Sequence, residues 1–397
     1  MLPHPIKVEI GASGNVRDEN GAAKFYSDVS SCPAEIGSAR TAVAYAAAVG
    51  GGVEAADAEA AYIQSELVGT PTFCILPPEW VSYMSKEVQQ AAAHMRMPVF
   101  RMLRSLYGHP QAGKFWEDHL VKVLESQGWR AIEGMKSCYM NARKGSPHGS
   151  VFLCVYVDDF IMSGKELKPL WEQLQSKIKF GEPPTSLDRF LGVKHSITTT
   201  NGVLTCAFDM SDFARSCVDR YCELTKCKRD KIGHADTPCR KDPPVYADDD
   251  LPGHYSAHAP ALLMKPLYLA RCARPEISFA IGRLARKITR WTRKDDRECD
   301  RLYAYLASTL RFILTGSIKV GCAGTLFVRD FPDADLAGDA DTARSTSGMW
   351  IELCDGEGGS FPPGMVVQAA DSSFAQHPRK RTSKSVSQHE RVCSANR

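Results

Sequence analysis

The sequence predicts an α+β protein built from more than one compact unit. Its 397 residues suffice for roughly two to four units with hydrophobic cores. A composition of 44% hydrophobic and 24% charged residues is that of a globular chain. Val151–Gly164 is rich in β-branched and aromatic residues, which favours strands. Leu167–Phe180 and Pro266–Gly316 have the apolar spacing of helices, so both kinds of element are expected.

Charge and cysteine usage exclude several classes of protein. The net charge is +3, so nucleic acid would have to bind to local basic clusters rather than to the whole chain. The fourteen cysteines contain no Cys-x-x-Cys pair, and we expect reduced thiols in a protein that is not secreted. No apolar run reaches the ~20 residues of a membrane span. One group has too irregular a spacing for a zinc site: Cys217, Cys222, Cys227, Cys239 and His234.

The stretch Val151–Gly164 reads V-F-L-C-V-Y-V-D-D-F-I-M-S-G and predicts a hairpin with Asp158 and Asp159 in its turn. Adjacent carboxylates between apolar strands repel each other unless a cation lies between them. Carboxylate oxygens are the ligands that Mg²⁺ prefers. The alternative is an acidic pair on a solvated turn.

The motif Tyr156-Val157-Asp158-Asp159 resembles the Y-V-D-D catalytic hairpin of reverse transcriptases. Two longer stretches are similar to copia-type LTR retrotransposon Pol polyproteins. Arg101–Trp116, R-M-L-R-S-L-Y-G-H-P-Q-A-G-K-F-W, resembles the family signature S-L-Y-G-L-K-Q-A-x-x-x-W. Leu326–Leu353 contains D-A-D-L-A-G-D-A-D-T-A-R-S-T-S-G and resembles the family's ribonuclease H opening. The motifs occur in the family's order along nearly the whole chain.

The resemblance implies a right-hand polymerase with a helical connection and a truncated ribonuclease H-like α/β unit. We expect fingers and palm in residues 1–185, a thumb-like region in 186–242, a linker and helical connection in 243–322, and a partial ribonuclease H-like domain in 323–397. The activity would be RNA-directed DNA polymerisation with two Mg²⁺ ions, for which Mn²⁺ could substitute. The partners would be an RNA template, a DNA primer, their RNA–DNA hybrid and dNTPs, with no membrane. Protease and integrase segments of the polyprotein would lie outside this chain, in a cytoplasmic retrotransposon particle or the nucleus.

The resemblance also assigns the catalytic carboxylates. Val53–Ser65 takes the place of the family's D-V-x-x-A-F-L strand, which makes Asp57 a catalytic residue and metal ligand together with Asp158 and Asp159. The alternative is that Asp57 begins an Ala-rich helix, where an acidic residue favours the positive end of the dipole. Tyr62 takes the place of the aromatic residue that excludes the ribose 2′-OH, and its alternative is an ordinary strand aromatic.

Four positions would bind the nucleotide: Lys7, Tyr62, Gln111 and Gly113. Lys7 matches a basic residue that holds the triphosphate, but Glu9 replaces the family's Arg, a charge reversal that should weaken nucleotide binding. Gln111 is predicted to open a helix that runs to about Gly128. The predicted apolar face of that helix is Phe115, Leu120, Val123 and Leu124. Three nearby cations either meet phosphates or lie on a solvated face: Arg101, Arg104 and Lys114.

The ribonuclease H unit is predicted to be a remnant. Asp333 takes the place of its first carboxylate, and Glu390 is the only candidate for the second. The family's further carboxylates lie beyond Arg397, and a two-metal hydrolase needs its carboxylates in one place. We therefore expect no ribonuclease H activity and regard a nuclease built on Asp333 and Glu390 as short of ligands. Another hypothesis is a degenerate, non-catalytic remnant of the whole retrotransposon enzyme, supported by Glu9 and opposed by the three retained carboxylates.

Several further elements are expected. They comprise a helix over Ser38–Val49 capped by Ser38, a strand within Pro71–Trp80, strands at Arg189–Val193 and Val203–Phe208, a helix over Ser211–Glu223, and a linker over Pro243–Pro252. By resemblance, Arg189–Val193 would lie next to the primer end, and the region with the basic stretch Lys226–Arg240 would be the thumb, which grips the duplex by its phosphates. The helices within Pro266–Gly316 would be connection helices, to which we assign packing rather than chemistry.

Overall fold

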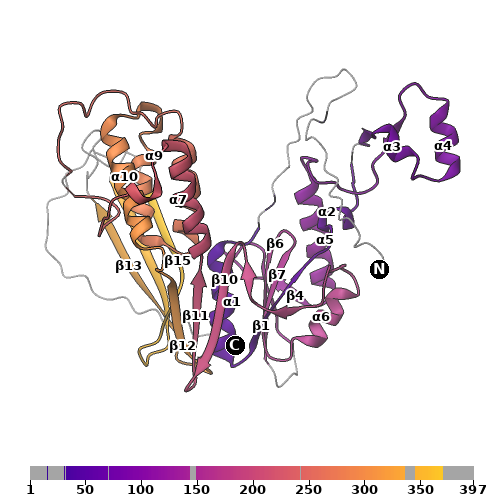
Figure 1. Cartoon of the computed structure of the whole chain (residues 1–397). Helices are drawn as coiled ribbons and strands as arrows, with labels where there is room; N and C mark the ends of the chain where they lie inside the picture. Colours follow the sequence, from indigo (N-terminus) through magenta and orange to yellow (C-terminus); the bar gives the residue numbers. More distant parts are fainter. Residues whose placement is uncertain are drawn as a thin grey trace, which may run out of the picture. The chain divides into compact units, whose positions relative to one another are not determined.

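The computed structural model describes residues 16, 31, 33–69, 71–143, 149–241, 243–335 and 345–369. Within this part the protein mixes helices and strands, which confirms the predicted α+β class (Figure 1). The chain divides into two compact units. The first comprises Met1–Glu35 and Glu54–Thr185, and the second comprises Ile36–Val53 and Ser186–Arg397.

The first unit is built on a sheet that has six strands among the described residues, in the order β4-β5-β6-β7-β1-β8. Its strands are β1 (Gly52–Asp57), β4 (Trp129–Ala131), β5 (Cys138–Asn141), β6 (Val151–Tyr156), β7 (Asp159–Gly164) and β8 (Thr185–Ser186). The hairpin of β6 and β7 confirms the two predicted strands, but only Asp158 of the acidic pair lies in the turn, because Asp159 is the first residue of β7 and pairs with Tyr156. Asp57 ends a strand, so the alternative that it begins a helix is wrong.

Alternate residues of the hairpin form the core of the first unit. Leu153 pairs with Met162 and Val155 with Phe160, and all four are buried. Helices α5 (Ala112–Ser126) and α6 (Lys168–Gln175) cover this face. Their buried side chains are Trp116, Leu120 and Leu124 from α5, and Leu170, Trp171 and Leu174 from α6. Burial of each such side chain contributes about 1.5–3 kcal/mol to the stability of the fold, so packing against α5 and α6 stabilises the hairpin.

Helix α6 is shorter than the predicted Leu167–Phe180. It ends at Gln175, and Phe180 forms a β-bridge with Ala58. The amphipathic pattern continues past the helix because Ile178 is buried in the core and Phe180 packs against it. The hydrophobic period therefore located the buried face correctly but not the end of the helix.

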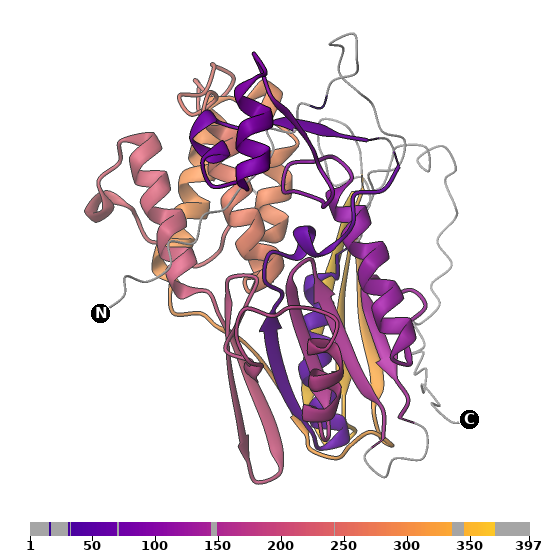
Figure 2. The same ribbon diagram turned by 90° about the vertical axis from the view of Figure 1, so that its right-hand side faces the viewer.

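A separate segment of the first unit projects away from the sheet (Figures 1 and 2). It contains β2 (Phe73–Ile75), α3 (Pro78–Val81), α4 (Lys86–Ala93) and β3 (Val99–Arg101), and β2 pairs with β3. The strand predicted within Pro71–Trp80 is confirmed as β2. The short helix α2 (Ala61–Gln64) joins this segment to β1.

The second unit has a seven-stranded sheet among the described residues, in the order β13-β14-β15-β12-β11-β10-β9. All neighbouring strands in it are antiparallel. The strands are β9 (Arg189–Phe190), β10 (Val193–Thr200), β11 (Val203–Asp209), β12 (Leu314–Lys319), β13 (Phe327–Asp335), β14 (Thr346–Cys354) and β15 (Ser360–Ala369). One sheet therefore joins segments predicted as thumb, connection and ribonuclease H. The boundaries among those three segments stay a prediction.

Helices pack on this sheet and on one another. They are α1 (Ile36–Val49), α7 (Ser211–Thr225), α8 (Ala259–Cys272), α9 (Ser278–Ala285) and α10 (Arg293–Ser308), with short 3₁₀ turns η1 (Arg229–Lys231), η2 (Pro275–Ile277) and η3 (Ile288–Arg290). Arg40 ties α1 to the unit, since its buried guanidinium donates to the carbonyl of Cys272 and lies 5.1 Å from the ring centroid of Phe208. Burial lowers the pKa of Arg40 to about 10.

Two predictions in this unit are wrong in detail. The helix predicted to be capped by Ser38 begins at Ile36, and Ser38 is buried within it. The stretch predicted as helical over Pro266–Gly316 starts earlier, at Ala259, and its last residues belong to β12. That strand pairs with β11, a distant partner that local periodicity does not reveal. Among the described helices, none combines the length and apolarity needed to cross a bilayer.

Candidate active site

The turn between β6 and β7 consists of Val157 and Asp158, because Tyr156 pairs directly with Asp159. Val157 has a φ of 58°, a region that β-branched residues rarely adopt. The indole Nε1 of Trp116 donates a 2.6 Å hydrogen bond to the carbonyl of Val157. Such unfavourable backbone conformations persist only where the surroundings fix them. At Val157, this conformation is fixed by the packing of the hairpin on the buried core and by the hydrogen bond from Trp116.

Strand β1 brings Asp57 to the same turn. In the sheet β1 lies beside β7. The backbone amide of Ala58 donates to the carbonyl of Asp158 at 2.8 Å, and the amide of Gly181 donates to the carbonyl of Asp57 at 3.0 Å. The residue that follows Asp57 is thus bonded to the turn that carries the acidic pair.

The three carboxylates act on one another electrostatically. The pKa of Asp159 is raised to about 6, first by burial and then by the charges of Asp158 and Asp57. Asp158 and Asp159 are half-buried, whereas Asp57 is exposed. Like charges in this arrangement favour protonation of one member, and a cation would reverse the effect.

The three groups offer carboxylate oxygens, the kind of ligand that Mg²⁺ prefers. Among the described residues, no group of three or more His, Cys, Asp or Glu side chains is placed so that it could hold a metal ion. The carboxylates of Asp57, Asp158 and Asp159 lie near one turn but are not drawn together as a metal site in this structure.

Tyr62 lies near the carboxylates. Its pKa is raised, first by burial and then by the charges of Asp158 and Tyr156. Its ring centroid is 4.3 Å from that of Tyr107, with the planes inclined at 39°. Tyr62 belongs to helix α2, so the alternative of an ordinary strand aromatic is wrong.

Gly113 lies in the first turn of α5, beside Tyr62. A Cβ added there would be 2.7 Å from Oγ of Ser31 and 3.9 Å from the hydroxyl of Tyr62. Ser31, Tyr62, Gly113, Trp116 and Val157 line one small cavity. Glycine at this position lets the chain at Ser31 pass close to the helix.

Gln111 stands at the N-cap position of α5, as the prediction of a helix opening there requires. Its backbone amide donates to Nδ1 of His109 at 3.2 Å. Two of the nearby cations have protein partners: Arg104 donates to the carbonyl of Gln64 at 3.1 Å, and Lys114 lies 3.2 Å from Asp118. The pair of Lys114 and Asp118 is exposed, and exposed ion pairs contribute little to stability.

Other predicted residues lie elsewhere. Lys7 and Glu390 fall outside the described residues. Asp333 is exposed on β13, opposite Gly348 of β14, in the second unit. Cys217, Cys222, Cys227 and Cys239 are free thiols.

Trp116 was missed as a functional candidate. The predicted apolar face of α5 contained Phe115 and Val123, but these are only half-buried. The buried positions Trp116, Leu120 and Leu124 are four residues apart, which is the spacing of one helix face. That spacing, together with the place of Trp116 at the end of the S-L-Y-G signature, was the available signal.

Comparison with known proteins identifies the family to which the chain belongs. The model of the family described as reverse transcriptase (RNA-dependent DNA polymerase) matches residues 13–234, more than half of the chain. The chain belongs to this reverse transcriptase family. The match includes the hairpin, β1 and α5.

Three relatives come from transposons. The Retrovirus-related Pol polyprotein from transposon TNT 1-94 of Nicotiana tabacum is 23% identical over 335 residues, covering 80% of this chain and 23% of that protein. The putative transposon Ty5-1 protein of Saccharomyces cerevisiae is 22% identical over 301 residues, covering 74% and 87%. The Retrovirus-related Pol polyprotein from transposon RE1 of Arabidopsis thaliana is 26% identical over 264 residues, covering 64% and 16%. The predicted resemblance to copia-type Pol polyproteins is confirmed, and the chain spans under a quarter of the two plant polyproteins.

Proposed function

We propose that this chain is an RNA-directed DNA polymerase of a copia-type retrotransposon, which adds dNTPs to a primer 3′-OH as an RNA template directs. One observation supports the proposal: Asp57, from a strand distant in sequence, ends beside the hairpin that carries Asp158 in its turn and Asp159 at the start of β7. Three carboxylates this close in the fold raise the pKa of one of them, and a bound cation would offset their repulsion. The sheet of the first unit would be the palm, and the β2–β3 segment would belong to the fingers.

Asp57, Asp158 and Asp159 would hold two Mg²⁺ ions. When bound, these ions would lower the pKa of the primer 3′-OH and stabilise the pyrophosphate leaving group. The chain itself places the carboxylates and keeps Asp159 partly desolvated. Protons compete with cations for Asp159, so polymerisation should decline below about pH 6.

Tyr62 would select deoxynucleotides by blocking a ribose 2′-OH. Its position beside Asp158 and against the ring of Tyr107 supports this role. Gln111 and Gly113, at the start of α5, would contact the incoming nucleotide or the template base. Lys7 would meet the triphosphate.

The wider assignments rest on the family. Residues 186–242 would act as a thumb, 243–322 as a connection and 323–397 as a partial ribonuclease H-like domain. Two relatives are named Pol polyproteins, and we infer that this chain is one segment of such a polyprotein, beside protease and integrase segments. Its place would be a cytoplasmic retrotransposon particle or the nucleus.

Primer extension on poly(rA)·oligo(dT) with Mg²⁺ and dTTP tests the proposal. Wild type should extend the primer, and Asp158→Asn should fall below about 1% of wild type because a ligand oxygen is lost. Glu172→Gln, which removes a charge from the exposed side of α6, is the matched control and should extend normally.

The other outcomes are equally informative. Equal extension by Asp158→Asn would reject the site. Extension by Glu9→Arg but not by wild type would indicate an intact palm with a defective triphosphate contact. No extension by any folded variant would favour the degenerate remnant.

A further inference from the structure

Tyr62, the residue proposed to select deoxynucleotides, lies on a helix that is too short to hold it in place. Helix α2 comprises four residues, and its N-cap residue Ala60 has a φ of 48° and makes no side-chain capping bond. A single helical turn has little rigidity of its own, because isolated helices shorter than about 12 residues are marginal in water. The orientation of the Tyr62 ring is therefore set by groups outside α2.

Buried backbone groups join the segment that carries Tyr62 to the segment that carries Tyr107. The amide of Ser65 donates to the carbonyl of Tyr62 at 3.1 Å, and the hydroxyl of Ser65 donates to the same carbonyl at 2.8 Å. The amide of Ser105 donates to the carbonyl of Ser65 at 3.1 Å. Ser65 and Ser105 are both buried. These hydrogen bonds fix the chain two residues before Tyr107 against the chain three residues after Tyr62.

The rings of Tyr62 and Tyr107 pack against each other. Their centroids are 4.3 Å apart and both side chains are half-buried. Aromatic pairs at such a separation attract each other beyond the effect of the area they bury. The hydroxyl end of Tyr62 lies beside the first turn of α5, since a Cβ added at Gly113 would be 3.9 Å from it. Tyr62 is thus contacted by a ring from one segment and by a helix start from another.

We propose that Tyr107 is a positioning residue for Tyr62 and thereby determines how strictly the polymerase excludes ribonucleotides. A side chain blocks a 2′-OH only while it stays in the blocking rotamer, and a side chain without close neighbours changes rotamer within nanoseconds. Packing on the Tyr107 ring stabilises one orientation of Tyr62 over the others. The inference rests on the proposed function, because the property that Tyr107 controls is the discrimination of that polymerase between dNTPs and NTPs.

This role differs from a direct contact between Tyr107 and the nucleotide. If Tyr107 acts through Tyr62, its replacement has no effect once the Tyr62 side chain is gone. If Tyr107 contacts the sugar or base itself, its replacement has the same effect with and without Tyr62. A double-mutant cycle separates these two cases, because only coupled residues depart from additivity.

The test is primer extension by the full chain on poly(rA)·oligo(dT) with Mg²⁺ and either dTTP or UTP. The measured quantity is the discrimination ratio, which is kcat/KM for dTTP divided by kcat/KM for UTP. In Tyr107→Leu this ratio should fall roughly 3- to 10-fold, the factor that corresponds to the loss of one aromatic pair. The fall should include a rise in kcat/KM for UTP, which general destabilisation of the fold would not produce. Tyr107→Phe keeps the ring and should keep the wild-type ratio.

Two further variants complete the experiment. Tyr62→Ala should lower the ratio by more than Tyr107→Leu does, and Tyr107→Leu should lower it no further in the Tyr62→Ala background. If Tyr107→Leu does not fold, Tyr107→His takes its place and should shift the ratio in the same direction.

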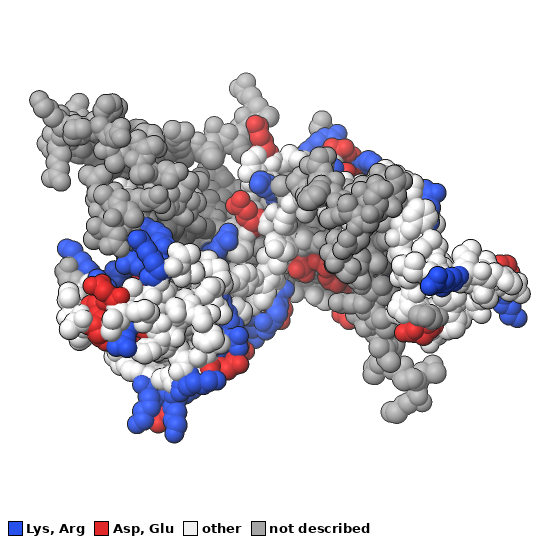
Figure 3. Space-filling model, turned by 90° about the horizontal axis from the view of Figure 1, so that it is seen from above, with Lys and Arg blue, Asp and Glu red and all other residues white. Residues whose placement is uncertain are grey.

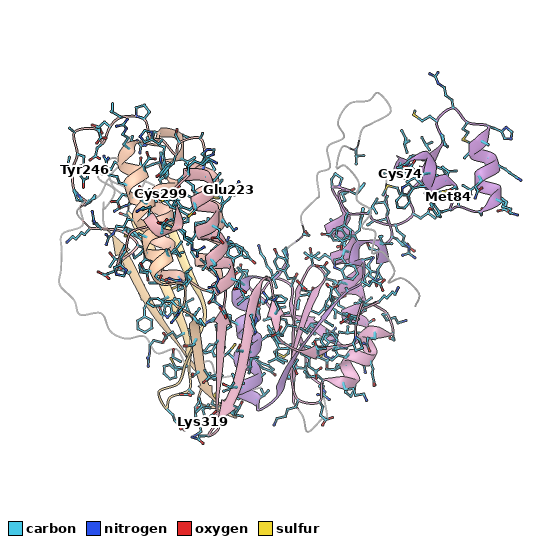
Figure 4. The ribbon with its side chains drawn as sticks, in the orientation of Figure 1. Cys74, Met84, Glu223, Tyr246, Cys299 and Lys319 are labelled. Carbon is cyan, nitrogen blue, oxygen red and sulfur yellow. The ribbon has the colours of Figure 1, made fainter. Side chains whose placement is uncertain are left out.

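Tyr83→Ala is the matched control, because it removes a tyrosine ring from the same unit at a position that is 87% exposed. Tyr83 precedes Met84, which Figure 4 labels on the segment that projects from the sheet. On the face seen in Figure 3, this segment carries only scattered Lys, Arg, Asp and Glu side chains. Tyr83→Ala should leave the discrimination ratio unchanged.

Failure of this inference is distinguishable from failure of the proposed function. Wild type that incorporates neither nucleotide would reject the polymerase and the inference with it. Wild type that discriminates, with an unchanged ratio in Tyr62→Ala, would reject Tyr62 as the block and hence Tyr107 as its positioning residue. A ratio that falls in Tyr62→Ala but not in Tyr107→Leu would overturn the role of Tyr107 alone. So would an undiminished effect of Tyr107→Leu in the Tyr62→Ala background, since Tyr107 would then act on the nucleotide directly.

Discussion

Asp159 shows how a single side chain reports on the whole site. Its pKa of about 6 lies above the ordinary value of 3.8, so between these pH values the folded protein holds more protons than the unfolded chain. The free energy of unfolding therefore falls as the pH rises through this window. The carboxylate weakens the fold above pH 6 and has no such effect below pH 4.

We expect Asp159→Asn to have a higher Tm than wild type at pH 8 in EDTA and the same Tm at pH 4. Replacing the carboxylate removes the repulsion by Asp158 and Asp57, which exists only when the group is ionised. Differential scanning calorimetry at both pH values measures this. Mg²⁺ should raise the Tm of wild type and not that of the variant, because it binds the folded site. The same Tm difference at pH 4 and pH 8 would contradict the electrostatic cause.

Trp116 is a positioning residue for the acidic turn. Trp116→Phe retains a ring in the core but removes the donor to the carbonyl of Val157. We expect kcat for dTTP addition to fall about 10-fold or more, with KM little changed, because small displacements of reacting groups are costly. The Mg²⁺ concentration for half-maximal activity should rise.

Trp171→Phe is the matched control for this measurement. Trp171 is equally buried in the same core, and its indole nitrogen has no hydrogen-bond partner in the described part. The variant Trp171→Phe should therefore lose packing contacts and no hydrogen bond. If both variants reduced kcat equally, the Trp116 bond would have no special role.

At the scale of elements, the first turn of α5 depends on a close approach. Alanine usually stabilises a helix interior by about 1 kcal/mol relative to glycine. At Gly113 the added Cβ would meet Ser31, 2.7 Å away, so this gain is offset by crowding that costs about 1–3 kcal/mol. At Gly282 of α9, an added Cβ meets nothing within 4 Å.

We therefore expect Gly282→Ala to raise the free energy of unfolding and Gly113→Ala to lower it or leave it unchanged. Urea unfolding, followed by far-UV circular dichroism, measures both. The double variant Ser31→Gly/Gly113→Ala should recover the helix gain, since the clashing side chain is gone. If Gly113→Ala alone stabilised the protein, the chain at Ser31 would have to move away from the added Cβ at little energetic cost.

At the scale of the molecule, one sheet in the second unit incorporates β13, β14 and β15, the strands of the segment predicted to be ribonuclease H-like. Asp333 is exposed on β13, which is the edge strand of that sheet. Among the described residues, no group of three or more possible metal ligands includes Asp333.

We expect the full chain to leave the RNA of an RNA–DNA hybrid uncut with Mg²⁺ or Mn²⁺ while it extends the DNA primer. Gel analysis of end-labelled RNA over the time of primer extension checks this. Asp333→Asn should change neither result. Cleavage that Asp333→Asn abolishes would establish a working hydrolase.

The sequence alone determined which residues form the acidic hairpin and that they form a strand, a turn and a second strand. Both the local pattern and the order of the motifs can be recognised without knowing any tertiary contact. It also predicted the opening of α5 at Gln111. These features depend on residues close together in the chain, where propensity and periodicity decide the conformation. The strand that contains Asp57 was expected only from the resemblance of Val53–Ser65 to a family strand, and the structure ends it at Asp57.

Only the tertiary structure decided which distant groups meet. The hydrogen bond from Trp116 to Val157, the place of Tyr62 beside Asp158 and the docking of Asp248 and Asp249 on α10 all join separate segments. Strand β12 includes residues that were predicted to be helical. Pairing with β11 provides hydrogen bonds for their backbone groups, and this outweighs a weak local preference for helix. The physical reason is that long-range packing and pairing energies exceed the differences in local propensity on which sequence patterns depend.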